Sequence, residues 1–190
     1  MSVVKQIGLC LSIVFFCSCK DNQQAPKPQE QKGDQPMSIN VSSPAFQEGG
    51  MIPAKYTADG QNISPPLKFD NIPPQAKSLA LISDDPDAPV GTWLHWLAWN
   101  IPAGTSELAE AMDTNGQLSD GTRQGTTDFG RTGYGGPAPP SGTHRYYFKV
   151  YALDCLLELK PGATRSELEK AMKGHILAQG QLMGKYQRRR

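Results

Sequence analysis

Hydrophobic residues from about residue 37 onward fall in short runs that glycine- and proline-rich segments separate. These runs predict strands over four ranges, 38–43, 78–83, 93–100 and 146–153. The runs at 78–83 (SLALIS) and 93–100 (WLHWLAWN) are apolar on both faces, which is typical of central strands in a packed two-layer structure. The pattern therefore indicates a mainly β domain.

Helical patterns are few and lie late in the chain. Thr164 and Glu167 have the spacing of a capping box, in which each side chain satisfies the other residue's backbone N–H. Apolar residues then recur at helical spacing, namely Leu168, Ala171, Met172, Ile176 and Leu177. A shorter helical turn is predicted over 106–112. We thus expect two β layers with one or two peripheral helices.

The first 18 residues have the features of an export signal. Lys5 precedes an apolar run of ten residues, 7–16, which is too short to span a bilayer. The following FCSC resembles the lipobox of bacterial lipoproteins, and this resemblance implies that Cys19 becomes lipidated and forms the new N-terminus. Ordinary signal cleavage followed by secretion as a soluble or periplasmic protein is the alternative.

Residues 20–36 (KDNQQAPKPQEQKGDQP) contain no large apolar residue. Such a segment has nothing to bury and predicts a flexible tether. We therefore divide the chain into a signal peptide (1–18), a lipidated cysteine with its tether (19–37) and one domain (38–190). This organisation predicts a lipid-anchored membrane protein of the bacterial cell envelope.

Charge and cysteine content narrow the possible functions. Without Lys5 the basic residues number 18, equal to the 18 acidic ones, and no basic stripe interleaved with aromatic residues indicates nucleic-acid binding. Cys155 is the only cysteine after residue 37, so no disulfide can stabilise the domain and packing must do so.

The segment 84–102 (DDPDAPVGTWLHWLAWNIP) places a histidine directly after a dense group of carboxylates. Strand alternation puts His95 on one face with Trp93, Leu97 and Trp99, and puts Leu94, Trp96 and Ala98 on the other. The preceding DDPDAP is typical of a turn, and the bonds before Pro86 and Pro89 are both candidates for the cis form. Taken alone, the pattern favours a half-buried structural histidine.

A second histidine lies in 133–154 (GYGGPAPPSGTHRYYFKVYALD). Here a loop rich in glycine and proline leads directly into a predicted strand. Alternation puts His144 and Tyr146 on the same face of that strand. Two of the domain's three histidines thus lie beside loops dense in glycine, proline and aspartate.

These long motifs, in this order, resemble the phosphatidylethanolamine-binding protein family, in its bacterial Raf-kinase-inhibitor-like branch. IPAKYTADGQNISPPLKF (52–69) and AMKGHILAQGQLMGKY (171–186) also resemble that branch. The resemblance implies a sandwich of two antiparallel sheets with a small anion-accepting pocket at one end. Carried over residue by residue, the implied pocket residues are Asp85, Asp87, His95, Pro140, Gly142, His144 and Tyr146. The DFG of 128–130 also matches, without an assigned role.

This residue set suits a phosphate-bearing ligand. Two imidazoles and a phenol can supply hydrogen-bond donors. Asp85 and Asp87 would orient and charge the histidines, since a nearby carboxylate raises the pKa of an imidazole. We therefore expect anion affinity to fall as the pH rises through the histidine range.

The leading hypothesis is a non-catalytic binding module for a small anionic or phosphate-bearing ligand, such as a phospholipid head group, with no cofactor and no metal. An inhibitor or modulator of an envelope protein is one alternative, with 115–131 as its surface. A hydrolase that depends on His and Asp is another, and the same residues could hold a divalent metal. No G-x-S-x-G motif supports the hydrolase, and His175 is expected to be structural.

Overall fold

The structure is a computed structural model that describes residues 37–188. The predicted signal peptide, the lipidation of Cys19 and most of the predicted tether fall outside these residues. The elements are β1 (Met37–Ser38), β2 (Asn40–Ser42), the 3-10 turn η1 (Ala54–Tyr56), β3 (Leu67–Asp70), β4 (Ser78–Asp85), β5 (Trp93–Pro102), β6 (Glu107–Leu108), β7 (Arg123–Gln124), β8 (Thr143–Leu153), α1 (Arg165–Met172) and β9 (Ile176–Gln187). Within 37–188, no helix is both long and apolar enough to cross a membrane.

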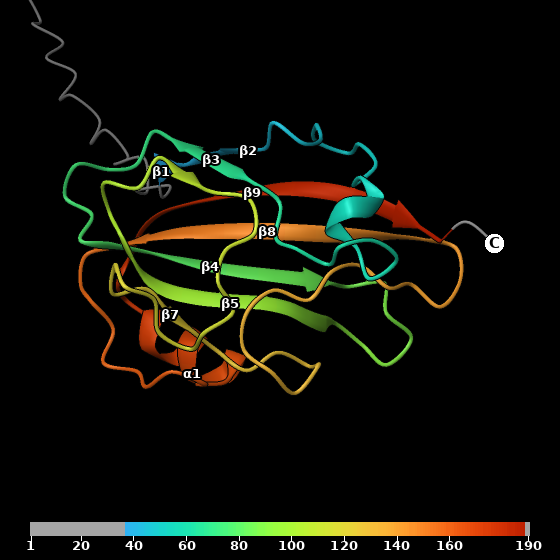
Figure 1. Ribbon diagram of the computed structural model, residues 1–190. Helices are drawn as coiled ribbons and strands as arrows, with labels where there is room; N and C mark the ends of the chain where they lie inside the picture. The colour runs from blue at the N-terminus through green and yellow to red at the C-terminus, as the bar shows by residue number, and fades with distance from the viewer. Residues whose placement is uncertain (1–36, 189–190) are drawn as a thin grey trace, which may run out of the picture. The chain divides into compact units, whose positions relative to one another are not determined.

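The strands form two sheets. The larger has the order β1-β9-β8-β4-β5-β7 and the smaller the order β2-β3-β6, and the two are stacked in Figure 1. Neighbouring strands are antiparallel except for the short pair β1 and β9. This confirms the predicted class, a mainly β sandwich of two sheets with one peripheral helix. The strand predicted over 38–43 is divided, because the chain passes from the large sheet to the small one at the buried Ile39.

Both faces of the large sheet are buried along its central strand β4. Leu79 and Leu81 of β4 belong to the core between the sheets, together with Phe69 of the small sheet. The alternate residues Ala80 and Ile82 belong to a second core, which α1 covers with its apolar stripe. The apolar character of SLALIS on both sides therefore reflects a helix on the second face, below the large sheet in Figure 1.

Helix α1 begins as predicted but ends early. The Thr164 hydroxyl accepts from the Glu167 N–H and the Glu167 carboxylate accepts from the Thr164 N–H, which completes the capping box. The helix stops at Met172, and Gly174 has a φ of 87° that suits glycine. The prediction that the helical stripe continues through Ile176 and Leu177 was wrong, because both residues belong to β9, which pairs along the whole of β8.

Two smaller predictions were also wrong. The segment predicted as a helical turn, 106–112, instead contains β6, which pairs with β3 because Leu108 is buried opposite Leu67. No peptide bond in residues 37–188 is cis, so the bonds before Pro86 and Pro89 are both trans.

The ends of the large sheet differ in what they carry. At one end β4 finishes at Asp85, β5 starts at Trp93 and β8 starts at Thr143. At the other end the backbone of Met37 pairs with Ala178, close to where β8 finishes.

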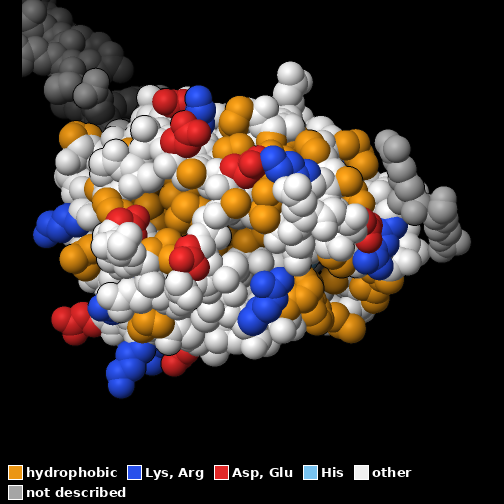
Figure 2. All heavy atoms as spheres, viewed as in Figure 1, with side chains coloured by type: hydrophobic (Ala, Val, Ile, Leu, Met, Phe, Trp, Pro, Cys, Tyr) orange, Lys and Arg blue, Asp and Glu red, His pale blue; other side chains and the backbone are white. Residues whose placement is uncertain are grey.

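On the face shown in Figure 2, acidic and basic side chains are interspersed, without a continuous surface of one sign.

Candidate functional site

His95 occupies a β-bulge at the start of β5. Ser83 pairs with Trp96 and Asp84 pairs with Leu94, so His95 is the extra residue on its strand. The bulge changes the expected alternation, and Leu94 lies in the core under α1 whereas Trp96 lies in the core between the sheets. The prediction that these two share a face was therefore wrong.

The His95 ring is fixed by a glycine 40 residues away. Its Nδ1 lies 2.6 Å from the Gly135 carbonyl oxygen, and the Gly135 N–H donates to the His95 carbonyl at 2.9 Å. A carbonyl only accepts, so Nδ1 carries the proton and donates, which leaves Nε2 with a lone pair in the neutral ring. Burial lowers the pKa of His95, while the hydrogen bond to the Gly135 carbonyl and then the nearby carboxylates, Asp85 first, oppose this to a smaller extent. The expectation that neighbouring carboxylates charge both histidines was wrong for His95.

His144 is held by Asp85. Its Nδ1 lies 2.8 Å from Asp85 Oδ2, and both side chains are buried. The other oxygen, Oδ1, accepts from the backbone N–H of Asp87 at 2.8 Å. Asp85 thus fixes both the His144 ring and the start of the β4–β5 loop. Within residues 37–188 no hydrogen bond reaches Nε2 of His95 or of His144.

Asp87 faces Arg145 rather than the histidines. Its carboxylate accepts from Arg145 Nε at 2.9 Å, from Nη2 at 2.6 Å and from the backbone N–H at 2.9 Å. These bonds lower the pKa of Asp87 to about 2. Asp87 therefore ties the β4–β5 loop to β8, and its side chain does not line the cavity.

Tyr146 lies beneath the two histidines. Its ring meets His95 edge-on at 5.2 Å and stacks with His144 at 6.5 Å between centroids. Its hydroxyl is buried without a hydrogen-bond partner among the described residues. Burial, and then the nearby Asp85 carboxylate, raise the pKa of Tyr146, so the phenol stays protonated. Tyr146 is not among the residues that line the cavity, so its phenol packs behind the two histidine rings.

Phe129 forms a wall to which sequence reasoning assigned no role. The Asp128 carboxylate accepts from the Leu94 N–H at 2.6 Å and so fastens the DFG turn to β5. The Phe129 ring then meets Trp93 at 5.6 Å and His95 at 5.3 Å, both edge-on. The signal available was the DFG motif itself, inside a long loop rich in glycine.

Gly135 makes this arrangement possible. A Cβ on it would lie 2.4 Å from Cε2 of Phe129, far inside van der Waals contact. The next residue is equally restricted, since a Cβ on Gly136 would lie 2.6 Å from the Tyr56 carbonyl oxygen. The last two glycines of GYGG therefore let the loop pack closely against both the aromatic wall and η1.

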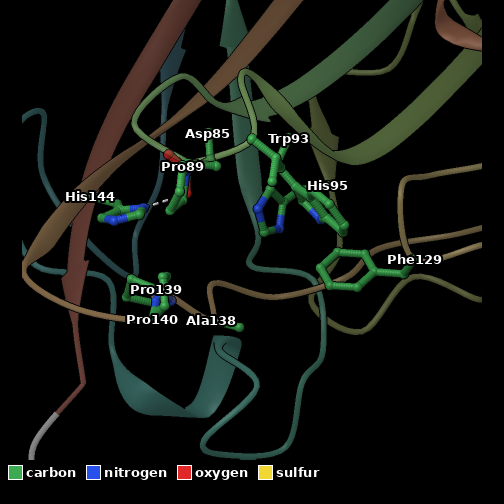
Figure 3. Close-up of a pocket in the computed structure, with 11 residues that line it drawn as sticks. Asp85, Pro89, Trp93, His95, Phe129, Ala138, Pro139, Pro140 and His144 are labelled. Atoms are coloured by element: carbon green, nitrogen blue, oxygen red, sulfur yellow. Dashed lines mark hydrogen bonds and ion pairs between the residues drawn. The ribbon is translucent and has the colours of Figure 1, made fainter.

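The residues around these groups enclose a cavity of about 320 Å³. Its lining is Asp85, Ala88, Pro89, Val90, Trp93, His95, Phe129, Ala138, Pro139, Pro140 and His144. In Figure 3, His144 stands on one side and His95 with Phe129 on the other, while the segment 138–140 runs below them. Gly142 lies outside this cavity, in a neighbouring hollow that Pro140 and Arg188 also line.

Of the seven residues that the resemblance implied, four line the cavity and a fifth, Tyr146, packs beneath it. Asp87 and Gly142 shape the surrounding loops. The walls are mainly apolar, and the polar groups are one carboxylate and two imidazoles. Such a cavity can bind a small ligand with an apolar part and a few hydrogen-bonding oxygens.

Comparison with known proteins agrees with this architecture. A model of the phosphatidylethanolamine-binding protein family matches residues 42–187. The chain is 51% identical over 150 residues to a UPF0098 protein of Methanothermobacter thermautotrophicus, covering 79% of this chain and 99% of that one. The crystal structure of a phosphatidylethanolamine-binding protein homolog from Chlamydia trachomatis superposes with a TM-score of 0.74 at 43% identity, covering 80% of this chain and 99% of that one.

Escherichia coli YbcL, described as a member of the mammalian PEBP family, also superposes with a TM-score of 0.74. It is 29% identical, and the match covers 80% of this chain and 99% of YbcL. Together with the fold and the family match, these similarities show that the chain belongs to the phosphatidylethanolamine-binding protein family.

Proposed function

We propose that this domain is a non-catalytic binding module whose cavity takes a small phosphate-bearing ligand. The observation that carries the proposal is the pair of imidazoles that line one cavity, His95 and His144, each with Nδ1 engaged and Nε2 free of protein hydrogen bonds among the described residues. The His95 ring bonds to a neutral carbonyl and the His144 ring to a carboxylate, so the two rings have different electrostatic surroundings.

The two rings are suited to opposite hydrogen-bonding roles. His144 has its Nδ1 occupied by the Asp85 carboxylate, and an imidazole with protons on both nitrogens would donate from Nε2. His95 is neutral and accepts at Nε2. A phosphate monoester with one remaining proton matches this pair, because its P–OH donates to His95 while a charged oxygen accepts from His144. The second phosphate pKa is about 6, so this form of the ligand is present at mildly acidic pH.

Calorimetric titration tests the proposal. We expect the protein to bind inorganic phosphate and phosphoethanolamine more tightly at pH 5.5 than at pH 8, and to bind sulfate more weakly because sulfate has no proton to donate to His95. His144→Gln and Asp85→Ala should lose binding. His175→Gln is the matched control, since His175 also bonds an aspartate through Nδ1 but lies at the other end of the sheet.

Three outcomes would contradict the proposal. A well-folded protein that binds neither phosphate compound would have no phosphate pocket, and an affinity unchanged by His144→Gln would place the anion elsewhere. Release of the alcohol from a phosphate ester during the titration would show a hydrolase instead of a binding module.

We further propose that the domain is tethered to the bacterial cell envelope through a lipid on Cys19. The support is the sequence of residues 1–37, with its short apolar run, its FCSC motif and its polar connecting segment. Cys19→Ser should shift the protein from the membrane fraction to the soluble fraction. An unchanged distribution would argue against the anchor.

A further inference from the structure

Three side chains of the kinds that bind metals meet at the end of the sheet opposite the pocket. They are Asp154, Cys155 and His175, and one donor atom of each lies within 4.8 Å of the others. Asp154 Oδ1 and His175 Nδ1 are 2.8 Å apart. The sequence analysis expected His175 to be structural, and His175 lies 20 positions after Cys155, so the sequence alone does not show that the two are close.

The local backbone brings these residues together. A register shift between β8 and β9 follows Ala152, since Ala152 pairs with Ala178 whereas Leu153 pairs with Ile176. This irregularity and the positive φ of Gly174 turn the start of β9 toward the end of β8.

Backbone hydrogen bonds hold this arrangement in place. The Asp154 N–H donates to the His175 carbonyl at 3.1 Å, and the His175 N–H donates to the Met172 carbonyl at 3.0 Å. The Ser78 hydroxyl donates to the Cys155 carbonyl at 2.6 Å. Because hydrogen bonds already hold the backbone of all three residues, binding of a ligand by their side chains would cost little backbone conformational entropy.

We infer that Asp154, Cys155 and His175 form a surface site for a thiophilic divalent cation such as Zn²⁺. A thiolate, an imidazole and a carboxylate are the three ligand types that Zn²⁺ takes, whereas Mg²⁺ and Ca²⁺ require oxygen ligands. Three protein ligands leave the fourth tetrahedral position to water. Ligand bonds of about 2.0–2.3 Å place the donor atoms about 3.3–3.7 Å apart, so the Asp154–His175 pair opens by less than about 1 Å.

The same three residue types can also form a nucleophilic cysteine site, but the geometry disfavours that function. The His175 Nδ1 is engaged by Asp154 rather than by the sulfur. Burial, and then the Asp154 carboxylate, raise the pKa of the Cys155 thiol, which is the opposite of an activated nucleophile. A bound cation displaces the thiol proton directly, so it does not depend on an activated cysteine.

One neighbouring charge opposes cation binding and offers a test. Lys77 is exposed and its ammonium group acts electrostatically on both Asp154 and Cys155. It donates its backbone N–H to the Leu153 carbonyl, so its side chain can be changed without loss of this contact. Lys77→Met therefore removes a repulsive charge while it keeps most of the side-chain volume.

The experiment uses the full chain with Cys10→Ser, Cys17→Ser and Cys19→Ser, so that Cys155 is the only thiol. Titration with Co²⁺ should produce a thiolate-to-cobalt charge-transfer band at one equivalent, and Zn²⁺ should abolish it. Cys155→Ser should lose the band and weaken Zn²⁺ binding about 100-fold or more, because loss of a ligand costs at least as much as loss of an outer-shell partner. Asp154→Asn and His175→Gln should each weaken Zn²⁺ binding with the near-UV circular dichroism spectrum intact.

Two further readouts separate this site from others. Zn²⁺ should raise the melting temperature of the Cys155-only chain but not of its Cys155→Ser form, since only binding to the native state stabilises it. Lys77→Met should tighten Zn²⁺ binding by about threefold at low salt. Absence of the charge-transfer band would overturn the inference, as would Zn²⁺ binding that survives Cys155→Ser or is lost with His144→Gln.

Discussion

Asp87→Asn tests whether this aspartate binds the ligand itself or supports the loop that does. The carboxylate makes three hydrogen bonds with Arg145 and so ties the loop between β4 and β5 to β8. That loop carries Pro89 and Val90 of the cavity wall. If Asp87 acts through Arg145, its replacement should loosen the wall without removing a ligand contact.

The size of the effect follows from the pKa. The hydrogen bonds from Arg145 lower the pKa of Asp87 from 3.8 to about 2. Each pKa unit corresponds to about 1.4 kcal/mol, so this shift sets an upper bound of about 2.5 kcal/mol. The side chains are 27% and 48% exposed for Asp87 and Arg145, so solvent screening reduces the expected contribution to about 1 kcal/mol. Because the native pKa is lowered, this stabilisation is complete above pH 3.8 and is lost as the pH falls through about 2.

Urea unfolding and phosphate calorimetry on a double-mutant cycle with Arg145→Met provide the assay. At pH 7 Asp87→Asn should lose about 1 kcal/mol of unfolding free energy, Arg145→Met should lose stability in the same direction, and the double variant should lose little more than Asp87→Asn. Phosphate affinity should fall a few-fold in either single variant and no further in the double. An Arg145→Met protein that binds phosphate like the wild type, beside an Asp87→Asn protein that does not, would refute the supporting role and assign Asp87 to the ligand.

Two other predictions concern the walls of the cavity. Gly135→Ala should fold but displace the partly exposed Phe129 ring, because the new Cβ would lie 2.4 Å from it, and calorimetry should show a lower affinity for phosphoethanolamine. Gly104→Ala is the control, since a Cβ there has nothing within 4 Å. Equal affinities of the two variants would argue that Phe129 does not form a wall of the binding cavity. Since burial lowers the pKa of His95, this histidine is protonated at a higher pH in the unfolded chain than in the native one. The free energy of unfolding measured in urea should therefore decline as the pH falls below about 6.5, by at most about 1.4 kcal/mol per pH unit. His95→Gln should make this decline shallower. Parallel plots of unfolding free energy against pH for the wild type and the variant would contradict a neutral His95 ring in the native state.

Much of the fold could be predicted from the sequence because the central strands are continuous runs of apolar residues. SLALIS is apolar on both faces and lies between two cores. Strand β9 was missed because ILAQGQLMGKYQ contains two glycines that weaken a strand pattern. Both glycines allow close packing, since a Cβ on Gly180 would lie 1.9 Å from the Ile39 carbonyl oxygen and one on Gly184 would lie 2.5 Å from Ile52 Cγ1. Such contacts join segments that are far apart in the chain, so the sequence around each glycine does not reveal them.

The same limit applied to the pocket. Motifs and alternation brought His95 and His144 to attention, but the state of His95 depends on the carbonyl of Gly135, 40 residues away. The bulge that turns His95 out of the regular alternation depends on the register of β4 against β5. Neither the register nor the loop contact is encoded within one strand, so the difference between the two imidazoles emerged only from the structure.

The N-terminal end of the described chain and the pocket lie at opposite ends of the large sheet. Met37 joins the large sheet beside Ala178, whereas the cavity opens where β8 begins, and the 11 residues of β8 separate these ends by about 35 Å. The described chain therefore enters the domain at the end away from the pocket. For a lipid-anchored protein, the predicted flexible tether 20–36 would have to let the domain turn before its cavity could contact the bilayer that holds the anchor, whereas a dissolved phosphate ester would need no such turn.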